Sequence, residues 1–164
     1  MPKVQAGMMA PTFTLGGLNG QQFVLADALK KGPVLAAFFK ISCPVCQFTF
    51  PFLQRIYETY GDSHVSFWGV SQDDVSDTRE FLNEFGVKFP TLIDADGYKV
   101  TKQYGLANVP SIFFIQPDGK VRTFSSGFTK KDLETISAEI ASASGKSSQP
   151  LFRPGEKVPD HRPG

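Results

Sequence analysis

The chain has 164 residues, of which 41% are hydrophobic and 20% charged, so it is long enough to bury the core of one ordinary domain. Its 17 Lys and Arg against 16 Asp and Glu leave a net charge of +1, which argues against a nucleic-acid partner. The longest apolar run, residues 34–39, is too short to cross a bilayer, and residues 1–7 lack the apolar segment of a signal peptide. We therefore expect no membrane association and a cytoplasmic location, or a periplasmic one if an export signal has been trimmed.

The first forty residues predict an extended segment, a hairpin and a buried strand. Residues 11–15 and 23–25 alternate between apolar and polar side chains, and the glycine-containing pairs between them are turn-forming. Residues 34–39 are continuously apolar after a Gly-Pro pair, which is typical of a strand buried on both faces.

A helix, a strand and a second helix follow. Residues 44–60 carry an aromatic or aliphatic side chain every four positions, the period of one helix face. Residues 64–70 predict a second buried strand, and residues 77–85 predict an amphipathic helix. Asp77 and Glu80 have the spacing of a capping box at the start of that helix.

The next segments predict a short helix at 98–104, two strands at 111–115 and 120–124 around a Pro-Asp-Gly turn, and a helix at 129–141. The alternation of strands and helices implies a parallel pair of strands, and the late hairpin adds an antiparallel edge. The sequence therefore predicts an α/β fold with a central mixed sheet flanked by helices and an N-terminal β extension.

The composition changes near residue 145. Proline, serine and charged residues dominate from there to the end, with little apolar content. We therefore divide the chain into a domain at 1–144 and a Pro-rich extended tail at 145–164 that we expect to lie outside the core. Leu151 and Phe152 are the residues with which the tail could dock onto the domain or onto a partner chain.

The two cysteines, Cys43 and Cys46, lie between a predicted strand and a predicted helix. Pro44 suits the first helical turn, where its missing N–H costs nothing. Cys43 is therefore expected at the helix N-terminus, where backbone amides and the helix dipole favour a thiolate. Cys46 should lie one turn inward and be less exposed. The pattern predicts that Cys43 attacks a disulfide and that Cys46 then resolves the mixed disulfide.

Two other interpretations of the cysteine pair are less favoured. A structural zinc site needs four ligands, and the two histidines, His64 and His161, have no ligand spacing. A pair of inert core cysteines would not require this placement at a strand–helix junction. We expect no metal and no cofactor beyond a redox-active Cys43–Cys46 disulfide.

The order of elements, the CxxC after the first core strand and the Val109-Pro110 pair before the hairpin strand resemble the thioredoxin fold. Residues 10–15, Phe50-Pro51 and residues 109–119 are similar to the AhpC/TSA (redoxin) branch, and most of all to its CxxC thiol–disulfide oxidoreductases. The resemblance covers about residues 5–142 and leaves out the tail.

The resemblance implies a particular substrate site. Pro110 is expected to be cis and to lie against the cysteine pair, and Val109 to offer backbone polar groups to the substrate. Pro44 and Val45 are expected to line the same site and to influence the reduction potential. The expected partners are protein thiols and disulfides and an unidentified reductant. The protein itself is expected to be a monomer or a dimer.

The sequence departs from its relatives at three positions. Ser42 stands where thioredoxins carry tryptophan, Ala37 where they carry a buried aspartate, and Thr49 where the cytochrome-maturation reductases carry glutamate. No carboxylate is therefore evident to accept the proton of Cys46. Lys40 could supply positive charge to the thiolate or be a solvated surface lysine, and both interpretations stay open.

Peroxiredoxins offer the rival interpretation. Their peroxide site needs a Thr or Ser three residues before the cysteine and a Pro four residues earlier, and this chain has Lys40 and Ala36 there. Arg122 matches an arginine that lowers the cysteine pKa in peroxiredoxins, although we favour a surface role for it. Slow thiol-dependent peroxide reduction remains an alternative. A redox-inactive binding module is another, against which the intact CxxC argues.

Overall fold

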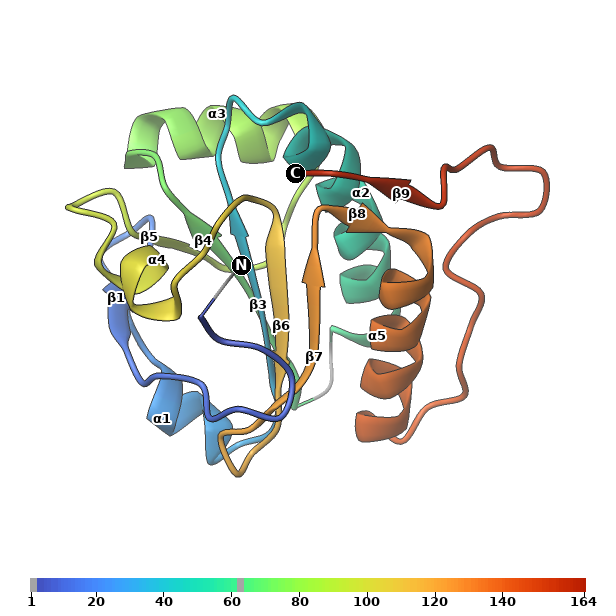
Figure 1. Ribbon diagram of the computed structural model, residues 1–164, viewed down its shortest axis with the longest axis horizontal. Coiled ribbons are helices and arrows are strands. Elements are labelled where there is room, and N and C mark those ends of the chain that lie inside the picture. The colour runs from blue at the N-terminus through green and yellow to red at the C-terminus, as the bar shows by residue number, and fades with distance from the viewer. Residues whose placement is uncertain (1–2, 62–63) are drawn as a thin grey trace.

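A five-stranded mixed sheet forms the centre of the molecule (Figure 1). In the computed structural model, which describes residues 3–61 and 64–164, the strand order is β5-β4-β3-β6-β7. Strands β3, β4 and β5 are parallel, and β6 and β7 are antiparallel to their neighbours. The strands are β3 (Val34–Phe39), β4 (Ser66–Ser71), β5 (Thr91–Ile93), β6 (Ser111–Ile115) and β7 (Val121–Ser126). The predicted mixed sheet is confirmed, with β5 as a third parallel strand that the sequence did not indicate.

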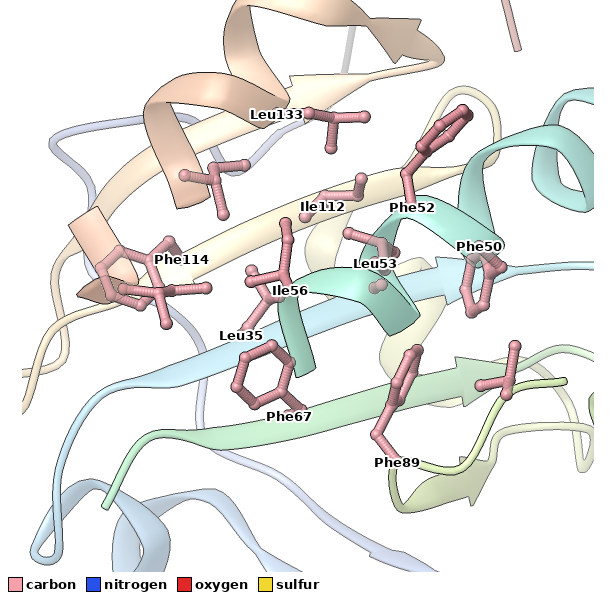
Figure 2. Packing of buried hydrophobic residues seen from close by; sticks show 14 of the residues in the cluster. Leu35, Phe50, Phe52, Leu53, Ile56, Phe67, Phe89, Ile112, Phe114 and Leu133 are labelled. Carbon is pink, nitrogen blue, oxygen red and sulfur yellow. The ribbon is translucent and has the colours of Figure 1, made fainter. Parts of the chain in front are cut away.

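Strand β3 is buried on both faces, as its unbroken apolar sequence predicts. Leu35, Ala37 and Phe39 face one hydrophobic cluster, whereas the alternate residues of the strand face a second cluster on the other side of the sheet. Figure 2 shows Leu35 packed beneath Leu53 and Ile56 in the first cluster. This arrangement fixes the end of β3, from which the chain leaves toward Cys43.

Helices cover both faces of the sheet (Figure 1). The first cluster receives side chains from α2 (Pro44–Tyr60), α3 (Val75–Phe85) and α5 (Lys130–Ala143). The second receives side chains from the short helices α1 (Leu25–Leu29) and α4 (Lys99–Tyr104). Within the described part of the chain, no helix has the length and apolar content needed to cross a membrane.

The N-terminal hairpin is present as β1 (Thr14–Gly16) paired antiparallel with β2 (Gln22–Val24). Two local predictions are corrected. Leu25, predicted to continue the second strand, begins α1 instead. Helix α3 begins at Val75, not at Asp77, because the carboxylate of Asp74 caps it by accepting the N–H of Asp77 at 2.8 Å. Asp77 therefore lies inside the first turn.

The tail is extended, but it packs on its own domain. Leu151 is only 8% exposed and belongs to the first hydrophobic cluster, and the ring of Phe152 lies 5.1 Å from that of Phe52 on α2. The expectation that the tail lies outside the core is therefore wrong at Leu151. The tail ends in β9 (His161–Arg162), which pairs antiparallel with β8 (Phe128–Thr129) beside α2 (Figure 1). The domain boundary at residue 145 stays a prediction.

Candidate active site

The two cysteines lie where β3 ends and α2 begins. Cys43 is the N-cap residue of α2, with extended backbone angles, and Pro44 opens the helix. The backbone N–H of Cys46 donates to Cys43 Sγ at 3.1 Å, and both thiols are free. A helix N-terminus whose amide already points at the sulfur stabilises negative charge on it. This is the placement that the sequence predicts for an attacking thiolate.

The two thiols have different surroundings. Cys43 is partly exposed, whereas Cys46 is 0% exposed in the core beneath it, which confirms the predicted difference in exposure. Burial raises the pKa of the Cys46 thiol far above its ordinary value, and the hydrogen bond with Cys43 and nearby negative charge add to the rise. Cys46 is therefore protonated in the reduced protein at neutral pH.

The loop before β6 contacts Cys43 through Val109. The Val109–Pro110 peptide bond is cis, as the resemblance implies. Pro110 is buried at the start of β6, and Val109 is partly exposed. The carbonyl oxygen of Val109 accepts a hydrogen bond from Cys43 Sγ at 3.5 Å. The structure therefore brings Cys43, Val109 and Pro110 together.

The remaining residues expected at the substrate site lie around this contact. Pro44 is exposed and Val45 partly exposed in the first turn of α2. The carbonyl of Lys40 accepts the N–H of Cys43 at 3.2 Å, and its exposed side chain lines a cavity of about 220 Å³ together with Val109. Lys40 thus borders the site, which is consistent with either of its two interpretations.

Arg122 is not brought to the cysteines. It lies near the beginning of β7, whereas the far end of that strand, at Ser126, pairs with Ser111 beside the cis-proline. Its guanidinium forms an ion pair with Glu139 on α5 at 2.7 Å. Arg122 therefore links β7 to α5 through this ion pair.

Two polar residues that the sequence analysis missed hold the loop before Cys43. Asp73 follows β4, and its carboxylate accepts the N–H of Ile41 at 2.8 Å. Gln47 on α2 donates its side-chain amide to the carbonyl of the same Ile41 at 2.9 Å. Because the carboxyl ends of parallel strands meet at one edge of a sheet, the position of Asp73 just after β4 was a usable signal.

Asp73 is also the carboxylate that influences the protonation of Cys46. Its negative charge contributes to the raised pKa of Cys46, so a carboxylate does lie near the dithiol. The expectation that no carboxylate accepts the proton of Cys46 stays a prediction. Thr49, at the position where some relatives carry glutamate, is fully buried. Its hydroxyl finds no hydrogen-bond partner within residues 3–61 and 64–164.

Comparison with known proteins agrees with this geometry. The model of the AhpC/TSA family matches residues 6–124, which include both cysteines and the cis-proline. The chain belongs to the AhpC/TSA family.

The proteins similar to this chain include thiol–disulfide oxidoreductases. The thiol–disulfide oxidoreductase ResA of Bacillus thuringiensis (strain Al Hakam) is 33% identical over 120 residues, covering 73% of this chain and 68% of the relative. The thioredoxin domain of a thiol–disulfide oxidoreductase from Bacteroides vulgatus is 25% identical with a TM-score of 0.73, covering 84% of this chain and 99% of that domain. A candidate protein disulfide isomerase from Bacteroides thetaiotaomicron, 23% identical, has a TM-score of 0.81 over 88% of this chain and 93% of its own. The fold is thioredoxin-like.

Proposed function

We propose that this protein exchanges dithiols and disulfides, with Cys43 as the attacking thiol and Cys46 as the resolving thiol. The class is that of its relatives: the protein is a thiol–disulfide oxidoreductase. One observation supports the assignment of roles. Cys43 is partly exposed at the N-terminus of α2 and its sulfur contacts the Val109 carbonyl, while Cys46 is buried beneath it.

The reaction has two steps. The Cys43 thiolate attacks one sulfur of the substrate disulfide, which forms a Cys43–substrate bond and releases the other substrate sulfur as a thiolate. Cys46 then loses its proton and attacks the sulfur of Cys43, which releases the second substrate thiolate. The substrate gains two electrons, and the protein retains a Cys43–Cys46 disulfide that an external dithiol must reduce again.

The mixed disulfide removes part of what keeps Cys46 protonated. In the reduced protein the hydrogen bond with Cys43 and the charge on that sulfur both raise the pKa of Cys46. Once Cys43 is bonded to the substrate it carries no charge and no proton, so ionisation of Cys46 becomes easier at the step that needs it. Burial and the charge of Asp73 still oppose ionisation, so we expect resolution to be slower than attack at neutral pH.

Peroxide reduction has weaker support as an activity. Lys40 occupies the position of the hydroxyl residue that would hold a peroxide oxygen, and Arg122 is paired with Glu139. We propose protein disulfides as substrates and a dithiol as reductant, with no cofactor. The cytoplasmic location and the monomeric or dimeric state stay predictions.

The test is a turnover assay with insulin disulfides as substrate and dithiothreitol as reductant. We expect the wild type to accelerate insulin reduction and to consume hydrogen peroxide only slowly, and Cys43→Ser to be inactive in both assays. Rapid peroxide consumption with no gain in insulin reduction would contradict the proposed function.

A further inference from the structure

The end of the tail returns to the active site. Strand β9 pairs with β8 through Phe128 opposite Arg162 and Thr129 opposite His161, and the carbonyl of Asp160 accepts the N–H of Lys130 at 2.9 Å. This pairing places residues 161–164 beside the start of α2 (Figure 1).

Arg162 connects the tail to the helix that carries the cysteines. Its guanidinium lies 5.0 Å from the ring centroid of Phe48, two residues beyond Cys46. A cation at this distance from an aromatic face is attracted to it. Phe48 is half-buried and its ring also packs on Phe128 of β8, so the contact holds Arg162 against the second turn of α2.

Gly164 lies against the cis-proline loop. A side-chain carbon added to Gly164 would collide with the carbonyl of Val109, the same oxygen that Cys43 Sγ contacts at 3.5 Å. Gly127 is equally close to the tail, since a side-chain carbon there would collide with the carbonyl of Arg162. Gly164 therefore lies directly against the backbone that we propose for substrate binding, and residues 162–164 pack on Gly127 beside it.

The tail reaches this position because it is anchored farther back. Arg55 on α2 makes two hydrogen bonds to the Glu156 carboxylate, at 2.8 and 2.6 Å. The N–H of Gln149 donates to the hydroxyl of Tyr60 at 2.9 Å, and Leu151 is buried. By contrast, residues 161–164 are exposed. They are held by the two-residue ladder, the contact of Arg162 with Phe48 and a hydrogen bond between His161 Nδ1 and Thr129 Oγ1 at 3.1 Å, so they can open while the anchors stay in place.

We propose that residues 161–164 form a wall of the substrate site beside Val109 and select among disulfide substrates. A small disulfide reaches Cys43 past the wall. A disulfide in a polypeptide, whose backbone must lie along Val109, has to displace β9 first. This inference rests on the proposed function, and it concerns residues outside the 6–124 match to the family.

The test compares two disulfide probes, oxidised glutathione and insulin, in four full-length proteins. Arg162→Ala removes the contact with Phe48, and Arg162→Pro removes in addition the backbone N–H that faces Phe128 in the β8–β9 ladder. Lys157→Ala is the matched control, because it removes one positive charge from an exposed position of the same tail. The readout is the rate constant for reaction of the reduced protein with each probe, with melting temperatures to check folding.

We expect Arg162→Ala to react about two- to fivefold faster with insulin, which matches the size of an exposed cation–aromatic contact. Arg162→Pro should react faster still, because it also weakens the β8–β9 ladder, while all rates with glutathione and all rates of Lys157→Ala stay at the wild-type level. If both tail variants react with insulin at an unchanged or slower rate, while the wild type reacts with both probes, the proposed wall is overturned and the proposed function is not. A wild type that reacts with neither probe would overturn the proposed function as well.

Discussion

The central sheet and the C-terminal tail reach the same site by different means. Strand β3 and helix α2 are positioned by continuous apolar faces that bury both sides of the sheet. The tail has no such face, and it is held by separate contacts at Leu151, Glu156 and β9. One region brings the thiols to the end of β3, and the other brings Gly164 against the loop opposite them.

The difference separates two kinds of information in a sequence. Periodic apolar residues specify which face of an element is buried, and they place Cys43 at a helix N-terminus without further help. Isolated anchors specify only where a segment touches the domain. A region assigned to a flexible tail by its composition can thus still form part of a functional site.

Removing core volume should have the largest effect. Leu53 is fully buried on α2, so Leu53→Ala should cost about 2–5 kcal/mol of unfolding free energy, measured by urea denaturation. Thr59→Ala, at an exposed position of the same helix, should change it by no more than about 0.5 kcal/mol. If Leu53→Ala lost less unfolding free energy than Leu151→Ala, the proposed difference between core and tail would be wrong.

Leu151 is the only member of its cluster that the tail supplies among the buried residues described. Leu151→Ala should cost about 2 kcal/mol, at the lower limit for a buried leucine, because the neighbouring tail can collapse around the gap. Limited proteolysis should cut residues 145–164 faster than in the wild type. Equal protease resistance in Leu151→Ala and Lys157→Ala would show that Leu151 does not anchor the tail.

The free energy of unfolding of the reduced protein should fall at high pH. The raised pKa of Cys46 means that the folded protein holds this proton after the unfolded chain has lost it near the ordinary value of 9.0. Above that pH the reduced protein should lose about 1.4 kcal/mol of stability per pH unit. The oxidised protein and Cys46→Ser lack this proton and serve as controls. A reduced and an oxidised protein with the same alkaline dependence would contradict the buried, protonated Cys46.

The smallest effect is expected at the tail's ion pair. The Arg55 guanidinium lowers the pKa of Glu156 to about 2, so the contribution of the pair is present above the usual carboxyl range near 4.5 and is lost as the pH falls toward 2. Pepsin should therefore cleave near Leu151 more slowly in the wild type than in Glu156→Gln at pH 4. The two proteins should converge near pH 2, and a difference that persists there would contradict the ion pair.

Much of the fold could be predicted from local pattern. Residues 34–39, 44–60 and 111–115 form the expected elements with the expected ends, because their apolar periods agree with burial on the sheet. Strand β5 and helix α1 were missed because three- and five-residue elements are too short to show a period. The start of α3 was misplaced because Asp74 and Asp77 are both good capping residues.

The site was predictable where the chain is contiguous or where the resemblance supplied the partner. Cys43 and Cys46 follow from spacing, and the place of Pro110 followed from the family. Asp73 was missed because its role depends on a contact with Ile41 that only the paired strands create. The position of Arg162 depends on β8, more than thirty residues earlier, and no pattern in the tail indicates that pairing.

The central claim is that Cys43 attacks and Cys46 resolves. The most direct measurement is intact-mass analysis of Cys46→Ser and Cys43→Ser after reaction of each reduced protein with insulin. We predict that Cys46→Ser accumulates a mixed disulfide between Cys43 and an insulin chain, and that Cys43→Ser, with its remaining thiol buried, accumulates none. A stable adduct on Cys46 in Cys43→Ser, with none on Cys46→Ser, would reverse the two roles and contradict the account.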